Sequence, residues 1–127
     1  MNSEDILNKI CYCTNNEIFL DYPHFKKLTY TLNQPIFDIV IAHFIKVLTE
    51  SLKNHSLFII HLNVKSISIT DVDKYYNFIK NYAILMKTMF PDKLDKCIIY
   101  NSPILFKNIF GLISIFLDKA TQQKFLF

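Results

Sequence analysis

Residues 90–127 read FPDKLDKCIIYNSPILFKNIFGLISIFLDKATQQKFLF, and this stretch decides the fold. Within it, residues 104–117 are apolar on nearly every side of a helix. Four positions interrupt this apolar run: Lys107, Asn108, Gly111 and Ser114. A surface helix normally carries one apolar stripe, because its other side meets water, and 14 residues are too few to cross a bilayer. We therefore expect a helix that contacts apolar groups on two sides, one of them the protein's own sheet.

Length and composition exclude several classes of protein. The chain has 127 residues, which predicts one domain over residues 1–127 with a single core. Its apolar fraction of 51% argues against disorder. Gly111 is the only glycine, so the chain cannot form a P-loop, a dinucleotide-binding loop or a GxSxG nucleophile elbow, each of which needs more than one glycine.

The positive charge is carried by lysine alone. The formal net charge is +3, and all 14 basic residues are lysines. Proteins that read nucleic acids favour arginine, whose planar guanidinium group binds guanine edges and phosphates through two hydrogen bonds at once. We therefore predict no nucleic-acid partner. A mild lysine excess is compatible with attraction to an anionic membrane surface, and equally with an ordinary solvated surface.

The cysteines and histidines predict neither a metal centre nor an active site. Cys11, Cys13 and Cys97 are odd in number, and residues 1–9 lack the apolar segment of a signal peptide, so we expect a reducing intracellular compartment. Cys11 and Cys13 have no second Cys or His pair at zinc-site spacing. The four histidines are scattered along the chain. We predict a non-enzymatic protein without a metal or a cofactor.

Apolar periodicity predicts an alternation of helices and strands. The predicted helices are residues 3–13 with Ser3 as N-cap, 35–52, 70–90 with Thr70 and Asp71 as caps, and 104–117. The predicted strands are 17–22, a segment within 56–69 around the unbroken apolar run 57–60, 96–100 and 124–127; residues 24–33 are predicted to be a loop. Right-handed crossovers place the helices of such a chain on the faces of a mostly parallel sheet. We therefore predict an α/β fold with a mostly parallel, twisted sheet of about four to five strands and flanking helices.

Short motifs in the last third resemble one known family. They are Phe90-Pro91-Asp92-Lys93-Leu94, Asn101-Ser102-Pro103, Leu105-Phe106, and Phe116-Leu117-Asp118 followed by Thr121 and Lys124. In order and spacing they resemble the CRAL-TRIO (Sec14-like) lipid-binding domain. That family reads approximately YPERL, then a strand ending in NAP, then an apolar helix running into PFLD, then TxxKI. The resemblance covers about 38 contiguous residues.

The resemblance implies a lipid gate. In such domains the apolar helix lies over a cavity floored by the sheet, shields the acyl chains of a lipid and swings outward at the membrane. Carried over to this chain, the gate and acyl-chain residues are Leu105, Phe106, Ile109, Phe110, Leu112, Ile113, Phe116 and Leu117. Each buried methylene contributes about 0.8 kcal/mol, so about a dozen per acyl chain can offset the extraction of a lipid from a bilayer.

The resemblance also implies a headgroup site. In family members that bind phosphatidylinositol, an acidic residue of the first motif and the Thr and Lys of the last motif hold the headgroup. These positions fall on Asp92, which is one methylene shorter than the usual Glu, on Thr121 and on Lys124. The lysine can neutralise a phosphate, the threonine can donate to it, and the aspartate can accept from inositol hydroxyls. The alternative interpretation is a helix-end cap at Thr121 with a solvated Asp92 and Lys124.

The family resemblance therefore predicts a lipid-binding or lipid-transfer protein. Its leading ligand is phosphatidylinositol or a phosphoinositide, and its expected location is the cytoplasm with transient peripheral membrane association. The alternative is a protein-interaction or homodimerisation module that uses the same apolar surface without lipid exchange.

Several positions depart from the family pattern. The family's arginine contact has no counterpart here, and His61 and Val64 stand near the places of an acidic residue and a glycine. Family members continue beyond the equivalent of Phe127 and carry a larger N-terminal subdomain, so we expect an unusually short member, truncated at both ends. Its cavity is then open, small or completed by a second copy, and the strand at 124–127 offers an exposed edge for a homodimer.

Overall fold

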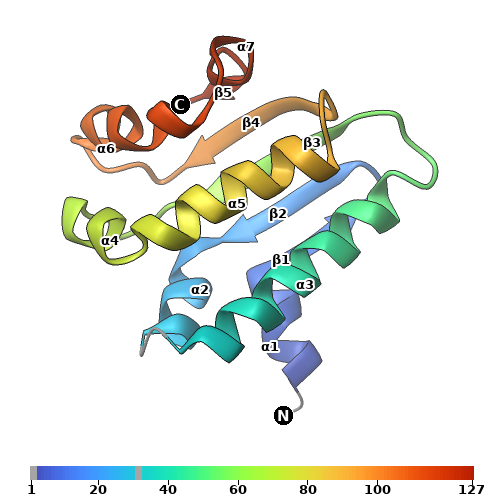
Figure 1. The fold of residues 1–127 in the computed structure, drawn as a ribbon, viewed down its shortest axis with the longest axis horizontal. Helices are drawn as coiled ribbons and strands as arrows, with labels where there is room; N and C mark the ends of the chain where they lie inside the picture. The colour runs from blue at the N-terminus through green and yellow to red at the C-terminus, as the bar shows by residue number, and fades with distance from the viewer. Residues whose placement is uncertain (1–2, 31–32) are drawn as a thin grey trace.

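The computed structural model of the protein describes residues 3–30 and 33–127. A five-stranded sheet has its strands in chain order (Figure 1). The strands are β1 (Cys11–Thr14), β2 (Glu17–Asp21), β3 (Phe58–Asn63), β4 (Leu94–Tyr100) and β5 (Phe125–Leu126). The helices are α1 (Ser3–Ile10), α2 (Tyr22–Thr29), α3 (Gln34–Ser51), α4 (Ile69–Lys74), α5 (Tyr76–Met89), α6 (Phe106–Ile113), the 3-10 turn η1 (Ser114–Phe116) and α7 (Lys119–Gln122). Strands β2 to β5 run parallel and β1 is antiparallel to β2, which confirms the predicted α/β fold.

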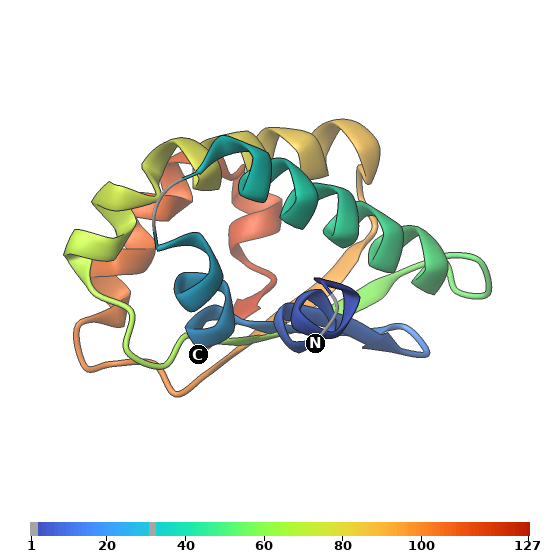
Figure 2. The same ribbon diagram turned by 90° about the horizontal axis from the view of Figure 1, so that it is seen from below.

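The sheet has two faces of different character. Alternate side chains of its strands are buried: Ile18, Phe58, Ile60, Cys97 and Ile99. Helices α3, α5 and α6 lie over the side to which these residues point, which we call the inner face (Figure 2). The intervening side chains point to the opposite side, the outer face, which is free of these three helices in the same view. A cavity large enough for a ligand is therefore expected on the inner face, beneath these helices.

The first helix is shorter than predicted. Helix α1 ends at Ile10 and Cys11 begins β1, so the predicted helix over residues 3–13 is wrong in its last three residues. Asn15, with φ 58°, makes the tight turn into β2, and Asn tolerates this left-handed conformation better than most residues. Pairing with β2 supplies the backbone partners that a longer helix would have used within itself. The predicted cap role of Ser3 lies outside the described side chains.

The loop predicted over residues 24–33 is wrong, because α2 occupies most of it. The Asp21 carboxylate accepts a hydrogen bond from the His24 amide at 3.0 Å and caps this helix. Pro23 lies in the first turn, where its missing amide proton costs nothing. Phe25 is 7% exposed and its ring centroid lies 5.2 Å from that of Tyr75. A cap and an aromatic contact therefore fix a helix that the apolar pattern left ambiguous; residues 31 and 32 lie outside the described part of the chain.

The first long helix is confirmed as α3. Its N-cap is Asn33, and Pro35 lies in its first turn. His43 Nε2 lies 2.8 Å from the carbonyl oxygen of Cys11, and Ser51 Oγ donates to the carbonyl oxygen of Asn15 at 3.0 Å. The first bond ties the antiparallel edge strand β1 to the helix, and the second ties the turn between β1 and β2 to it.

The second long helix is divided in two. The predicted helix over residues 70–90 breaks at Tyr75, which has φ −99° and ψ 16° and lies between α4 and α5. Ser68, rather than the predicted Thr70 or Asp71, is the N-cap: it accepts from the Asp71 amide at 3.2 Å, and Asp71 accepts from the Ser68 amide at 3.3 Å. This capping box places Asp71 at a buried position.

The helix predicted over residues 104–117 is also shorter and is split. Helix α6 ends at Ile113, η1 follows, and Leu117 is extended with φ −113° and ψ 141°. Gln122 Nε2 donates to the carbonyl oxygens of Ser114 at 3.0 Å and Leu117 at 2.8 Å. The bond to Leu117 satisfies a carbonyl group at the end of η1, and the bond to Ser114 adds a second donor to a carbonyl that already accepts from the Leu117 amide at 2.9 Å. The predicted strand at 124–127 is confirmed as the two-residue β5, which pairs with β4.

Candidate functional site

A cavity of about 510 Å³ lies between the inner face of the sheet and helices α5 and α6. Ile60, Leu62 and Ile99 of the sheet line one side of it, and Met86 of α5 and Phe110 of α6 line another. Ligand pockets of this size with mostly apolar walls and a few polar groups are typical of sites that enclose small molecules. The inner face therefore provides a compartment suited to an apolar ligand.

Helix α6 and η1 form one wall of the cavity. Five of the eight predicted gate residues line it: Phe106, Phe110, Ile113, Phe116 and Leu117. Ile109 is only 2% exposed and belongs to the core, whereas Leu105 and Leu112 are exposed. The wall therefore presents an aromatic and aliphatic surface to whatever the cavity holds.

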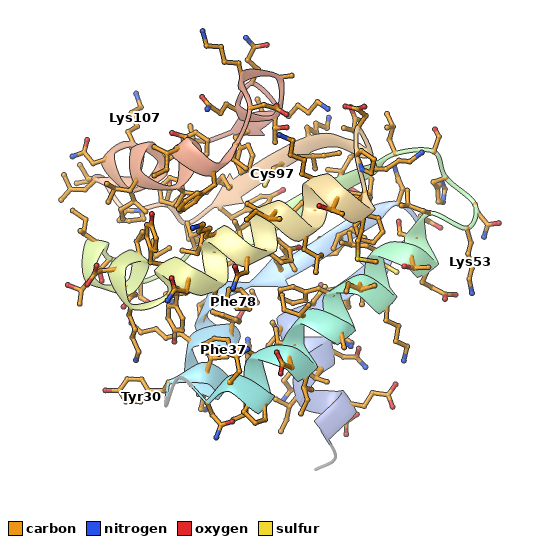
Figure 3. The ribbon with its side chains drawn as sticks, viewed as in Figure 1. Tyr30, Phe37, Lys53, Phe78, Cys97 and Lys107 are labelled. Carbon is orange, nitrogen blue, oxygen red and sulfur yellow. The ribbon has the colours of Figure 1, made fainter. Side chains whose placement is uncertain are left out.

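The same segment also has an exposed apolar side. We call it the outer gate surface, and it consists of Ile104, Leu105, Leu112 and Ile115. Ile104 is fully exposed and Ile115 is 69% exposed. Lys107 of α6 extends away from the body of the protein (Figure 3). The gate segment thus has one apolar side in the cavity and another on the surface.

Aromatic contacts hold the gate segment in place. The ring centroid of Phe110 lies 5.0 Å from that of Phe125 and 5.0 Å from that of Phe127. Phe116 meets Tyr76 of α5 edge-on at 5.2 Å. Because dispersion contacts of this kind can be exchanged for contacts with an acyl chain, the segment can give way to a ligand without losing a hydrogen bond at these rings.

The three predicted headgroup residues all line the same cavity. Asp92 lies in the turn between α5 and β4 with φ 58°, Thr121 lies in α7, and Lys124 lies between α7 and β5. The carbonyl oxygen of Lys124 accepts from the Cys97 amide at 2.8 Å, so this residue is fixed beside β4. Positions far apart in the sequence therefore face one compartment.

Asp118, rather than Thr121, caps helix α7. Its Oδ1 accepts from the Thr121 amide at 2.7 Å. The pKa of Asp118 is lowered by hydrogen bonds from Thr121 and further by the charges of Lys87 and Lys124. Both lysines line the cavity, so a carboxylate and two ammonium groups are gathered at this end of it.

Lys87 is a candidate site residue that sequence reasoning missed. It lines the cavity together with Ala83 and Phe90, which stand four residues before it and three after it on α5. Residues at these spacings share one side of a helix. The helical period of α5 could therefore have placed this lysine on the cavity side.

A second polar group faces the cavity near the opposite end of α5. Asp71 is 7% exposed, and its Oδ2 lies 3.0 Å from Lys26 Nζ. Burial alone would raise the pKa of Asp71, but the neighbouring Tyr22 hydroxyl and the Lys26 ammonium outweigh it, and this pKa is lowered. The Tyr22 hydroxyl is itself buried and forms no hydrogen bond of normal geometry within the described residues. The cavity thus has polar groups at both ends and apolar walls between them.

The cysteines act as packing groups. Cys11 and Cys97 are buried, and burial raises the pKa of the Cys97 thiol to about 12, so this thiol stays protonated at neutral pH. Across residues 3–30 and 33–127, no three His, Cys, Asp or Glu side chains are grouped so that they could hold a metal ion. In that same part of the chain, no helix has both the length and the apolar composition needed to cross a membrane.

A sequence profile of the CRAL/TRIO domain matches residues 17–127. The chain belongs to the CRAL/TRIO domain family. This is a family of lipid-binding domains that are generally not enzymes. The family predicted from the motifs of residues 90–127 is therefore confirmed, and the match extends it upstream through β2, α3 and β3.

Relatives and solved structures agree with this assignment. The SEC14 cytosolic factor of Yarrowia lipolytica is 29% identical over 63 residues, which are 50% of this chain and 13% of that protein. A CRAL-TRIO domain-containing protein of Saccharomyces cerevisiae is 30% identical over 63 residues, 50% of this chain and 20% of that protein. The crystal structure of Sfh5 has a TM-score of 0.79 at 19% identity and covers 98% of this chain and 48% of that one. The chain spans less than half the length of each of these three, and the likeness to Sfh5 concerns the fold alone.

Proposed function

We propose that this CRAL/TRIO domain is a non-enzymatic carrier that takes up one phospholipid, with phosphatidylinositol or a phosphoinositide as its preferred ligand. The observation that carries the proposal is a single cavity with apolar walls and with Asp92, Thr121 and Lys124 in its lining. An acyl chain needs apolar walls, and a phosphate-bearing headgroup needs polar and charged side chains. No covalent step is part of this function, because the ligand is held and released unchanged.

The headgroup would be recognised by charge-assisted hydrogen bonds. Lys124 and Lys87 supply two ammonium groups for phosphate oxygens, and Thr121 supplies a hydroxyl donor. Asp92 and Asp118 supply acceptors for inositol hydroxyls. Hydrogen bonds to charged partners are shorter and stronger than neutral ones. Two separate lysines suit a headgroup that presents more than one anionic group.

The acyl chains would lie along the apolar walls beneath the gate segment. Burial of each methylene stabilises the complex by about 0.8 kcal/mol. Entry requires the gate segment to move, and the outer gate surface provides the apolar contact with a bilayer that would accompany this movement. Lys107, which extends from the same helix, adds attraction to anionic lipids. We accordingly place the protein in the cytoplasm with transient peripheral membrane association.

The proposal is tested by identifying what the chain binds. The purified protein is incubated with vesicles that contain phosphatidylinositol among other phospholipids, re-isolated, extracted, and its lipid identified by mass spectrometry. We expect one phospholipid per chain, enriched in phosphatidylinositol relative to the vesicles. A folded chain that stays lipid-free and dimeric in the presence of vesicles would instead favour the protein-interaction module described above.

A further inference from the structure

The outer face of the sheet carries a row of side chains that crosses all five strands and is apolar except for His61 on β3. Strand register aligns one residue from each strand: Tyr12, Phe19, His61, Ile98 and Leu126. The rings of the first three stack, with centroid distances of 4.9 Å and 4.7 Å. The two ends of this outer row, Tyr12 and Leu126, are 46% and 49% exposed. A sheet face directed at water normally carries polar side chains, so this row marks an interaction surface.

The residues beside the outer row carry opposite charges on the two sides of β3. Glu17 on β2, Ile59 on β3 and Lys96 on β4 lie at one level across the strands. Glu17 is held on the outer face because its Oε1 lies 2.9 Å from His61 Nε2. An acid therefore lies on one side of the central strand, a base lies on the other, and an isoleucine lies between them.

We propose that this outer face binds the outer face of a second copy of the chain, about a two-fold axis parallel to the strands and above β3. A half-turn about this axis leaves every residue at the same height along the strands. It moves the strands that lie on one side of β3 to the other side of β3. Strand β2 of one copy then lies over β4 of the other. Glu17 therefore meets Lys96 of the second copy, and Lys96 meets Glu17, with the two Ile59 side chains between these pairs.

The same rotation matches the outer row with itself. Tyr12 meets Leu126 of the second copy, and Phe19 meets Ile98. His61 meets its own counterpart at the axis. Two sheets that stack face to face with nearly aligned strands are a common packing arrangement, and every apolar group of the row meets an apolar or ring partner here. Self-complementarity in charge and in apolar contact is what a two-fold interface requires.

This interface is distinct from both surfaces discussed above. Pairing through the edge strand β5 would involve only Phe125 and Leu126, because this strand has two residues. The gate segment lies on the inner side of the sheet (Figure 2), and the cavity is lined by inner-face residues such as Ile60 and Ile99. Dimerisation through the outer face therefore leaves both gate segments free, and it does not depend on which ligand the cavity takes.

The interface is small, and the dimer is accordingly expected to be weak. Five strands about 4.8 Å apart and about five residues of 3.3 Å rise give a patch of roughly 24 by 17 Å per copy. Such a patch is about half of the roughly 800 Å² per partner that standard specific interfaces bury, and it lies in the size range of weak, transient contacts. We therefore expect a dissociation constant in the micromolar range, so that monomer and dimer coexist at accessible concentrations.

Complementary charge reversals test the proposal. Sedimentation analysis of the full chain over a concentration series should show a dimer. Glu17→Lys and Lys96→Glu should each weaken it by about tenfold or more, because each creates two like-charge pairs. An equimolar mixture of the two variants should restore a heterodimer, since position 17 of each chain then meets the opposite charge at position 96 of the other.

Control variants show whether a loss of the dimer comes from this interface, rather than from an added charge elsewhere or from misfolding. Ile84→Lys places the same charge on α5 at a residue that is 54% exposed, and it should leave the dimer intact. Circular dichroism verifies the folding of each variant. If a charge-reversal variant fails to fold, Tyr12→Asp is measured in its place, because Tyr12 lies at the exposed end of the outer row. This variant should abolish the dimer. A chain that is monomeric at all concentrations, a dimer indifferent to both charge reversals, or a mixture that restores nothing would each overturn the proposal.

Discussion

The two faces of the sheet are built by the same strands and meet different surroundings. On the inner face, Ile60 and Ile99 line a cavity beneath helices. On the outer face, Phe19, His61 and Ile98 stand in a cross-strand row, on the side of the sheet away from helices α3, α5 and α6. Both faces are apolar in the middle, so apolar character alone does not assign a role to a strand residue. What lies over each face therefore decides its role: helices that enclose a cavity suit a ligand, and a sheet face outside those helices suits a protein surface.

Charge is also arranged differently on the two faces. The cavity collects its polar groups at its ends, with Lys87 and Lys124 near Asp118 and with Asp71 near Lys26. The outer face places Glu17 and Lys96 on opposite sides of an apolar centre. The first arrangement suits a ligand with a polar head and an apolar body, and the second suits a copy of itself.

The largest effect should come from a charge on the cavity side of α6. Phe110→Asp places a carboxylate where the ring now lines the cavity, and burial of an unpaired charge costs several kcal/mol. Uptake of a fluorescent phospholipid from vesicles should therefore fall to background while circular dichroism shows a folded chain. Phe110→Leu, which keeps the wall apolar, should retain uptake. Undiminished uptake by the aspartate variant would contradict the role of this wall.

The next effect should be specific for the headgroup. Lys124→Ala removes an ammonium group from the cavity lining and should weaken phosphoinositide binding by roughly 1.5 to 3 kcal/mol, the range for hydrogen bonds to charged groups. Lys119→Ala, which changes an exposed lysine of α7 outside the cavity lining, is the matched control and should bind like the wild type. Titration against vesicles of defined headgroup measures both variants. An equal loss for a lipid with an uncharged headgroup would remove the headgroup assignment.

At the other end of the cavity, Asp71 should make stability depend on acid pH. Its pKa in the folded protein is lowered, so its contribution is complete above its ordinary pKa and is lost as the pH falls through the lowered value. Asp71→Asn should reduce the free energy of unfolding at pH 7 by roughly 1 to 3 kcal/mol. It should also flatten the decline of stability between about pH 5 and pH 2. Urea unfolding at a series of pH values measures this, and parallel curves for both proteins would contradict the role of Asp71.

The smallest effect should come from the outer face. His61 lies 2.7 Å from the Tyr100 hydroxyl and 2.9 Å from Glu17, but the Glu17 side chain is 44% exposed, so water competes for its hydrogen bond. His61→Gln should therefore lower the free energy of unfolding by at most about 1 kcal/mol and leave phospholipid uptake unchanged. Urea unfolding and the vesicle assay are the measurements. A loss of uptake comparable to that of Phe110→Asp would show that the two faces are not independent.

Strong local signals were enough to predict much of the fold. The run at residues 57–60 predicted β3, Pro35 and the spacing of three and four after it predicted α3, and Pro91 marked the end of α5. The motifs at residues 90–127 predicted the family, and through it Asp92, Thr121 and Lys124, which the structure places in one cavity lining. Their roles in binding a headgroup remain predictions.

The missed features depend on contacts that are distant in sequence or on single caps. The four residues of β1 are too few for a strand period and owe their conformation to pairing with β2. Helix α2 depends on the cap at Asp21 and on burial of Phe25 against Tyr75. The outer row exists only through strand register, which brings Tyr12 and Leu126 to the two ends of one line. No local pattern contains that information.

The most direct test is native mass spectrometry of the chain after incubation with vesicles that contain phosphatidylinositol, compared with Phe110→Asp treated in the same way. If the inner face is a lipid compartment, each wild-type chain, monomeric or dimeric, gains the mass of one phosphatidylinositol, and the variant gains none. A folded wild-type chain that keeps its unliganded mass, or a variant that gains the same lipid, would contradict the assignment of this cavity to a phospholipid.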